Sequence, residues 1–194
     1  EVKSFLEVPL IEDLPKGSMS VRKGPRSISW RADKPSTLFW CEAMDGGDPQ
    51  KEVSHRDEVF EMDAPFQGEK KFLIKTIDRF YSMDWGNDGL AIAYDYWWNT
   101  RNTRAYMFNP SSAKGEVKEI YNRNYQDRYN DPGEFVMKKN QYGRATLIEE
   151  DGHLYLLGDG FSEKGKRPFV DKMEISSFKK ERLWRADSDE QLEN

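Results

Sequence analysis

The chain has 194 residues, which is enough for about one domain with a sizeable hydrophobic core. Charged residues make up 34% of it and the net charge is -5, with Lys and Arg interspersed among Asp and Glu, which excludes the basic face of a general nucleic-acid binder. An aromatic content of 13% argues against disorder, and the single cysteine, Cys41, excludes an intrachain disulfide and a cysteine-rich metal site.

The N-terminal segment, residues 1–23, begins abruptly in strand-like sequence. Residues 3–8 match the closing strand of the later units but have no unit before them, so we interpret them as an orphan strand, the outer strand of a preceding unit, followed by a linker. The segment lacks the pattern of a secretory signal peptide. No apolar run in the sequence approaches the ~20 residues that a membrane helix requires, so no membrane partner is expected.

Three further units follow, each built of short stretches of alternating polarity between turns rich in Gly, Asn, Asp and Pro. The first unit spans residues 24–77, with strands expected at 28–30, 38–40, 59–62 and 71–74. The second spans 78–124, with strands expected at 83–85, 90–97, 105–108 and 117–121. The third spans 125–187, with strands expected at 136–138, 145–148, 170–175 and 181–184. An additional candidate at 153–157 leaves its strand count open, and residues 188–194 form a tail.

The alternation is clearest between Leu90 and Trp97, where even-numbered residues fall on one face and odd-numbered residues on the other. The units also repeat: Trp30, Trp85 and Lys138 hold matching places, 55 and then 53 positions apart. We therefore expect Trp30 and Trp85 to occupy equivalent buried positions. Four strands in each repeat of this length are typical of a propeller blade with variable loops.

The sequence thus predicts an all-β fold: a partial, open β-propeller of about three four-stranded antiparallel blades plus an orphan N-terminal strand. Three blades do not close a ring. The first and last blades therefore expose apolar faces, and we expect the chain to self-associate.

A nucleophilic catalytic site is not expected in this chain. Its two histidines are His55, in a polar loop, and His153, at the start of a strand, and they are too far apart in sequence to suggest a metal site. The segment around Ser162, from Gly160 to Gly165, has one residue too many for a Gly-x-Ser-x-Gly nucleophile elbow. The Asp84–Gly89 segment partly imitates a calcium loop, but Gly86 replaces a ligand, which favours a hairpin turn. We expect no catalytic residue, metal or cofactor.

Arginines in the polar loops are the candidate binding residues. Arg128 lies in an Arg- and Asp-rich loop, and Arg56 and Arg167 lie in similar polar connections. An Arg near the mouth of a propeller can hold a substrate carboxylate in a bidentate fork, and the alternative is that these residues bridge adjacent blades. The aromatic segment 97–101 is expected at an exposed hairpin end, and packing between blades is an equal alternative for it.

Seven stretches in order carry a family resemblance: GPRSISWRAD at 24–33, EAMDGGDP at 42–49, HRD at 55–57, APF at 64–66, DRYNDPG at 127–133, GDGFS at 158–162 and RPF at 167–169. Together they resemble the middle of the propeller in the glutamyl-endopeptidase-like branch of the prolyl oligopeptidase family of serine peptidases. The resemblance covers nearly the whole chain.

The resemblance implies an N-terminal propeller followed by a C-terminal α/β-hydrolase domain with a Ser-Asp-His triad. The propeller would restrict access to peptide substrates, and its partner would be the hydrolase domain of the same polypeptide, which this sequence lacks. Bacterial members imply a periplasmic or secreted location, which nothing in the residues supports. Two alternatives remain: a free-standing propeller that binds protein or glycan, and a propeller glycosidase using carboxylates such as Asp84, Asp127 and Asp131.

Overall fold

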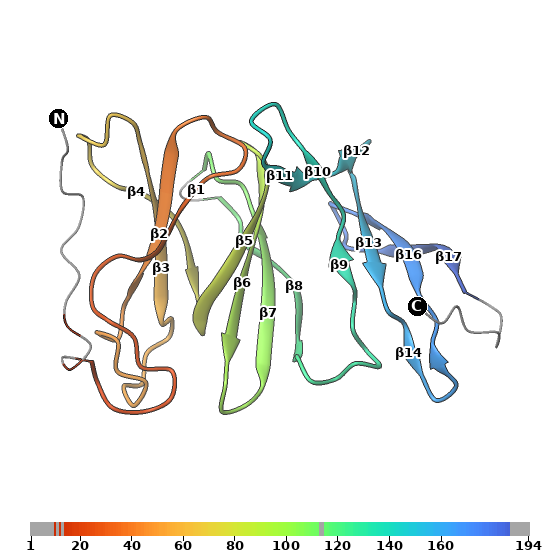
Figure 1. Ribbon diagram of the computed structural model, residues 1–194, viewed down its shortest axis with the longest axis horizontal. Helices are drawn as coiled ribbons and strands as arrows, with labels where there is room; N and C mark the ends of the chain where they lie inside the picture. The colour runs from red at the N-terminus through yellow and green to blue at the C-terminus, as the bar shows by residue number, and fades with distance from the viewer. Residues whose placement is uncertain (1–9, 11, 13, 113–114, 187–194) are drawn as a thin grey trace.

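The computed structural model describes residues 10, 12, 14–112 and 115–186. The strand expected at 3–8 and the tail at 188–194 lie outside these described residues. The described part forms no α-helix, and its β-strands make three large sheets, side by side along the long axis of the molecule, and two small two-stranded sheets (Figure 1). It contains no helix long and apolar enough to cross a membrane.

The first two blades are regular four-stranded antiparallel meanders, with strand orders β1-β2-β3-β4 and β5-β6-β7-β8. The first blade consists of β1 (Arg26–Trp30), β2 (Thr37–Ala43), β3 (Asp57–Asp63) and β4 (Lys71–Thr76). The second consists of β5 (Arg79–Asn87), β6 (Leu90–Trp97), β7 (Asn102–Phe108) and β8 (Lys118–Asn124). The Asp84–Gly89 segment is the predicted hairpin turn, in which Asn87 Oδ1 accepts the Gly89 N–H at 2.8 Å.

The third blade is a larger sheet in which β12 (Glu149–Glu150), β13 (His153–Gly158), β16 (Phe169–Glu174) and β17 (Lys180–Arg185) follow one another. A further short strand, β9 (Glu134–Phe135), pairs with β13 as well. The candidate at 153–157 is therefore the second strand of the blade, which resolves the open strand count. Two small hairpins extend from this sheet: β10 (Met137–Lys139) with β11 (Ala145–Leu147), and β14 (Phe161–Ser162) with β15 (Gly165–Lys166).

The prediction that 136–138 and 145–148 are two ordinary strands of the third blade is wrong. Residues 137–139 and 145–147 pair with each other as a separate two-stranded sheet, and this sheet lies against β5 of the second blade. The hairpin has the polarity pattern and the turn glycine of a blade hairpin, so the local sequence alone does not distinguish the two.

The hydrophobic core consists of two layers, one between each pair of neighbouring blades. The alternation in β6 divides as predicted: Ala91 and Ala93 face the first blade, whereas Leu90 and Ile92 face the third. Cys41 is fully buried in the first layer, as expected for core packing, and burial raises the pKa of its thiol to about 11.

The expectation that Trp30 and Trp85 are equally buried is wrong. Trp85 is 2% exposed because Phe39 of the first blade covers it, with ring centroids 5.2 Å apart. Trp30 is 47% exposed, and its ring contacts Phe66 at a centroid distance of 6.0 Å. Trp30 pairs with Leu38 at the end of β1, and the Arg144 guanidinium lies 5.9 Å from its ring centroid but leaves about half of the residue exposed.

Candidate functional site

The three arginines that the sequence analysis selected as candidate binding residues all lie in loops at one end of the sheets. In a meander, alternate connections emerge at the same end, and here these are residues 44–56, 77–78, 98–101, 125–133 and 159–168, which we call the basal loops (lower end in Figure 1). Arg56, Arg128 and Arg167 belong to the first, fourth and fifth of them. The basal loops are therefore the place to look for a site.

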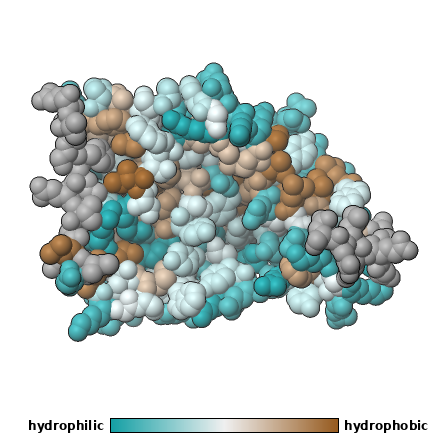
Figure 2. Space-filling model, in the orientation of Figure 1, coloured by the Kyte–Doolittle hydropathy of each residue, from teal (hydrophilic) through white to brown (hydrophobic). Residues whose placement is uncertain are grey.

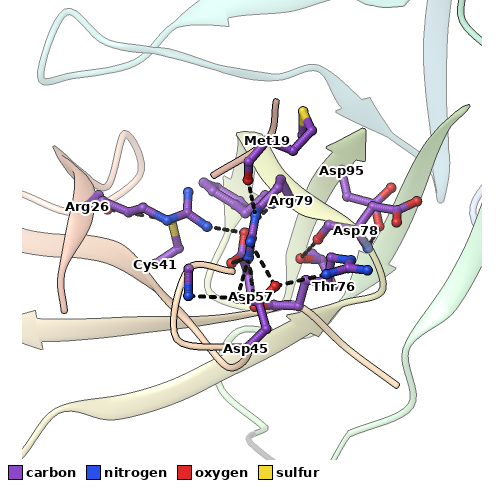
Figure 3. A network of polar contacts seen from close by, with 12 residues as sticks. Met19, Arg26, Cys41, Asp45, Asp57, Thr76, Asp78, Arg79 and Asp95 are labelled. Carbon is purple, nitrogen blue, oxygen red and sulfur yellow. Dashed lines mark hydrogen bonds and ion pairs between the residues drawn. The ribbon is translucent and has the colours of Figure 1, made fainter. Parts of the chain in front are cut away.

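A buried network of ion pairs underlies these loops between the first and second blades (Figure 3). Arg79, at the start of β5, is 1% exposed and binds Asp45 with two nitrogens, at 3.0 and 2.7 Å. The same guanidinium donates to Asp57 at 3.2 Å and to the Met19 carbonyl at 3.1 Å. One arginine of the second blade therefore holds a loop and a strand of the first.

Both carboxylates of this network have further partners. Asp57 pairs with Arg26 and accepts the Phe80 N–H at 2.7 Å. Asp45 accepts the Gly47 N–H at 2.8 Å, and it also pairs with a second arginine, Arg56, at 2.9 Å. Burial alone would raise the pKa of Asp45, but the hydrogen bonds and charge of Arg79 outweigh it and lower that pKa below its ordinary value.

A third buried carboxylate, Asp95 of β6, continues the network into the second blade. It accepts hydrogen bonds from the Asp78 N–H at 2.9 Å and from the Tyr106 hydroxyl at 2.7 Å. Burial raises the pKa of Asp95, and these hydrogen bonds offset the effect only in part. Because the carboxylates of this region are engaged by the protein's own donors, the network joins the blades and does not present an acid or base to a ligand.

The three nominated arginines differ in what they contact. Arg56 is committed to Asp45 and also stacks on Trp97 of the second blade, 4.1 Å from the ring centroid. Arg167 is half-buried, and its backbone N–H donates to Gly160 at 2.9 Å within the β14–β15 hairpin region. Arg128 is exposed, and its guanidinium lies 5.3 Å from the ring centroid of Phe161. Arg128 is thus the one of the three that is exposed as a whole residue, whereas Arg56 and Arg167 are half-buried.

The loop that carries Arg128 is organised by its own side chains. Asp127 accepts the Tyr129 and Asn130 N–H groups at 3.2 Å each and the Asn130 side chain at 2.8 Å, and the side-chain bond from Asn130 is the main cause of its lowered pKa. Arg123 pairs with Asp131 at 2.6 Å. These contacts fix the turn on which Arg128 stands.

The expected aromatic hairpin end is present, with its two tryptophans in different environments. Trp97 is half-buried under Arg56, which is packing between blades, whereas Trp98 is 51% exposed. Arg101 stacks on Trp98 at 3.7 Å from the ring centroid. Of the two alternatives for this segment, packing between blades therefore applies to Trp97 and an exposed hairpin end applies to Trp98.

Neither histidine belongs to a Ser-His-carboxylate set within the described residues. His55 Nδ1 lies 3.2 Å from the hydroxyl of its exposed neighbour Ser54, and His153 Nδ1 lies 2.8 Å from the Asp151 carbonyl. Ser162 donates its hydroxyl to the Gly165 carbonyl at 2.8 Å, inside its own hairpin. No group of three metal-ligating side chains occurs in the part of the chain that the structure describes.

Sequence reasoning missed the buried network because Asp and Arg are mostly surface residues. A positional signal was present: Arg26 and Arg79 open the first strands of successive blades, at the spacing of the repeat, and Asp57 opens β3 of the first blade. A charged residue recurring at the start of a strand is the pattern that would have identified it.

Comparison with known proteins adds a relationship along the whole chain. No family model matches the sequence. The chain is 39% identical to a probable chloroplastic glutamyl endopeptidase of Arabidopsis thaliana and 36% identical to a protein of the same name from Oryza sativa subsp. japonica, in both cases over 99% of its length. It spans 21% of the length of each relative.

A distant structural similarity was also found, to an oligogalacturonate lyase in complex with manganese. The TM-score is 0.38 and the sequence identity 14%, over 86% of this chain and 37% of that one. A similarity at this level carries no information on activity.

Proposed function

We propose that this chain is a non-catalytic propeller segment of a serine peptidase of the prolyl oligopeptidase family, in its glutamyl-endopeptidase-like branch. Its role is to scaffold an α/β-hydrolase domain of the same polypeptide and to limit which peptides reach that domain. The observation that carries the proposal is the 39% identity to a probable glutamyl endopeptidase over 99% of this chain. The all-β architecture of the described residues is consistent with it.

The absence of catalytic chemistry from this segment is tested directly on the purified chain. We expect no hydrolysis of a fluorogenic peptide panel and no labelling by a serine-reactive fluorophosphonate, because Ser162 is bonded within its hairpin and has no histidine partner there. The matched control is the Ser162→Ala chain. Specific labelling that this substitution abolishes would overturn the proposal.

The assignment to a peptidase is tested by the coding sequence that follows Asn194. A Gly-x-Ser-x-Gly segment followed by Asp and His supports it, because these residues form the nucleophile elbow and triad of an α/β-hydrolase. A stop codon or an unrelated binding module at that place favours the alternative, a free-standing propeller that binds protein or glycan. The exposed rings of Trp98 and Tyr129, 51% and 67% exposed, are the contact surface that this alternative would use.

We further propose that Arg128 is the residue of this segment that contacts a substrate carboxylate. It is exposed on a turn that Asp127 holds in place, whereas Arg56 is already paired with Asp45. Binding of a fluorescent tetraglutamate peptide, measured by anisotropy, should weaken several-fold in Arg128→Ala and should not change in Arg56→Ala. Equal binding of the corresponding tetraglutamine peptide would contradict a role for the carboxylate.

A further inference from the structure

The hairpin β10–β11 is an excursion from the first strand of the third blade. On one side of it β9 pairs with β13 at Phe135 and Leu156, and on the other side β12 pairs with the same strand at Glu149 and Leu154. The two halves meet again at the base of the hairpin, where the Ile148 N–H donates to the Val136 carbonyl at 3.0 Å. β9 and β12 are therefore two pieces of one interrupted strand, and the residues between them are free to reach elsewhere.

The hairpin lies against β5 of the second blade, and its tip reaches past that blade to the first. Asn140 donates its side-chain amide to the Ala32 carbonyl at 2.7 Å. Arg144 donates to three more carbonyls of the same β1–β2 turn: those of Arg31 at 2.8 Å, Lys34 at 2.7 Å and Pro35 at 3.3 Å. These partners lie 108 to 113 positions apart in the sequence, so the contact links the first and third blades directly.

The tip is preorganised for this contact. Asn140 Oδ1 accepts the N–H groups of Tyr142 at 2.9 Å and Arg144 at 3.1 Å, which folds the turn around that side chain. Gly143 takes a φ of 70°, in the left-handed region that a residue without Cβ adopts readily. The guanidinium of Arg144 therefore meets the first blade from a fixed turn and loses little freedom on contact.

The turn that receives the tip is also rigid, and it is held on the second blade. The Arg31 side chain is 1% exposed, pairs with Asp33 at 2.6 Å and with Glu61, and stacks on Trp85 of the second blade at 4.1 Å from the ring centroid. The contact thus joins three blades: the hairpin of the third holds the turn of the first, and that turn rests on the second.

We propose that residues 136–148 form a strap that fixes the angle between the first and third blades. Neighbouring blades that only pack against each other can still rotate slightly apart at their interface. Direct hydrogen bonds from the third blade to the first restrict this rotation at both interfaces together. The strap binds backbone carbonyls of the β1–β2 turn, and the Arg144 guanidinium also lies 5.9 Å from the ring centroid of Trp30, the residue just before that turn. Release of Arg144 would let the blades open and widen the space that their first strands face. This inference goes beyond the proposed function and holds whether or not the chain serves a peptidase.

The test is the distance between spin labels on the outer blades, measured by pulsed electron spin resonance on the full chain. Glu69→Cys on the first blade and Glu181→Cys on the third are exposed positions for the labels. The native Cys41 is fully buried with a raised pKa, so it reacts little with the labelling reagent. The strap variants are Arg144→Ala and Asn140→Ala, and the matched control is Lys139→Ala, an exposed residue of the same hairpin.

We expect the distance distribution to broaden at least twofold, or to shift to longer distances, in Arg144→Ala, and to change in the same direction but less in Asn140→Ala. The distribution should stay as in the parent chain in Lys139→Ala. If circular dichroism shows that Arg144→Ala does not fold, Asn140→Ala is judged by the same criterion. Folded strap variants whose distributions superimpose on that of Lys139→Ala would overturn the proposal.

Discussion

Removal of the Arg79 guanidinium should destabilise the chain strongly, because it leaves two buried carboxylates short of a partner. Arg79→Met keeps most of the apolar stem and deletes the charge that bonds Asp45 twice and Asp57 once. Breaking a buried ion pair on one side typically costs about 3–5 kcal/mol. Arg56 still pairs with Asp45, and Arg26 with Asp57, so we expect the lower end of that range, about 3 kcal/mol.

The assay is urea unfolding followed by tryptophan fluorescence, for which the chain has six reporters. With a slope of about 2 kcal/mol per molar urea, this loss moves the midpoint by roughly 1.5 M. The matched control is Lys71→Met, which breaks the exposed pair with Asp63 and should cost less than about 1 kcal/mol.

A double-mutant cycle separates the lost interaction from general damage. Asp45→Ala alone leaves the buried Arg79 with Asp57 as its remaining carboxylate partner. The double variant Asp45→Ala with Arg79→Met removes both charges of the pair, so its loss should be clearly smaller than the sum of the two single losses. Additive losses, or a loss in Arg79→Met no larger than that in Lys71→Met, would refute the reasoning.

Two further predictions rest on burial and charge. Trp85→Ala should cost about 3–5 kcal/mol in urea unfolding and Trp30→Ala less than half as much, because only the first ring is covered by a neighbouring blade; equal losses would contradict this. The lowered pKa of Asp45 means that its contribution to stability is present above the ordinary pKa of an aspartate and is lost as the pH falls through the lowered value. The stability difference between the parent chain and Asp45→Asn, measured from pH 7 to about 3, should therefore shrink toward acid, and a difference independent of pH would disprove the assignment.

Much of the fold could be predicted because period-two alternation is a local signal. In β6 the alternation assigns Ala91 and Ala93 to one core layer and Leu90 and Ile92 to the other, and the structure agrees at each position. Burial was less predictable, because it depends on what faces a residue. Trp30 and Trp85 share the repeat pattern, but Trp85 is buried against Phe39 of the neighbouring blade, whereas Trp30 stays 47% exposed.

The strap and the buried network were missed from the sequence for different reasons. Arg144 donates to backbone carbonyls of residues more than 100 positions earlier in the chain. Every residue has a backbone carbonyl, so the residue types at those positions do not indicate the contact. Asp45 and Arg79 are each of a residue type that is usually exposed, so neither residue alone indicates burial. Only the two positions considered together could have indicated a buried ion pair. Of the three arginines nominated from the loops, the structure leaves Arg128 exposed and commits Arg56 to Asp45.

The far face of the third blade leads to the last prediction, that the chain self-associates. Leu157 of β13 and Trp184 of β17 lie on this face, on either side of Val170 in the middle strand β16, with which each is paired. They are 52% and 54% exposed. Apolar side chains also reach the surface of the otherwise mainly hydrophilic face in Figure 2. Burying neighbouring apolar side chains of this kind in an interface is favourable. The simplest interface is a symmetric dimer, in which a second copy of the chain packs against this face about a two-fold axis.

Sedimentation velocity from low to high micromolar concentration should therefore show a shift from monomer to dimer. Trp184→Ser should weaken the association because it removes the largest ring of the face, at about 25 cal/mol for each Å² of apolar surface that a partner would cover. Trp98→Ser is the matched control: it removes an equally exposed ring, 51% against 54%, from a basal loop of the second blade. A parent chain that stays monomeric at every concentration, or equal weakening by both substitutions, would show that this face is not where copies meet.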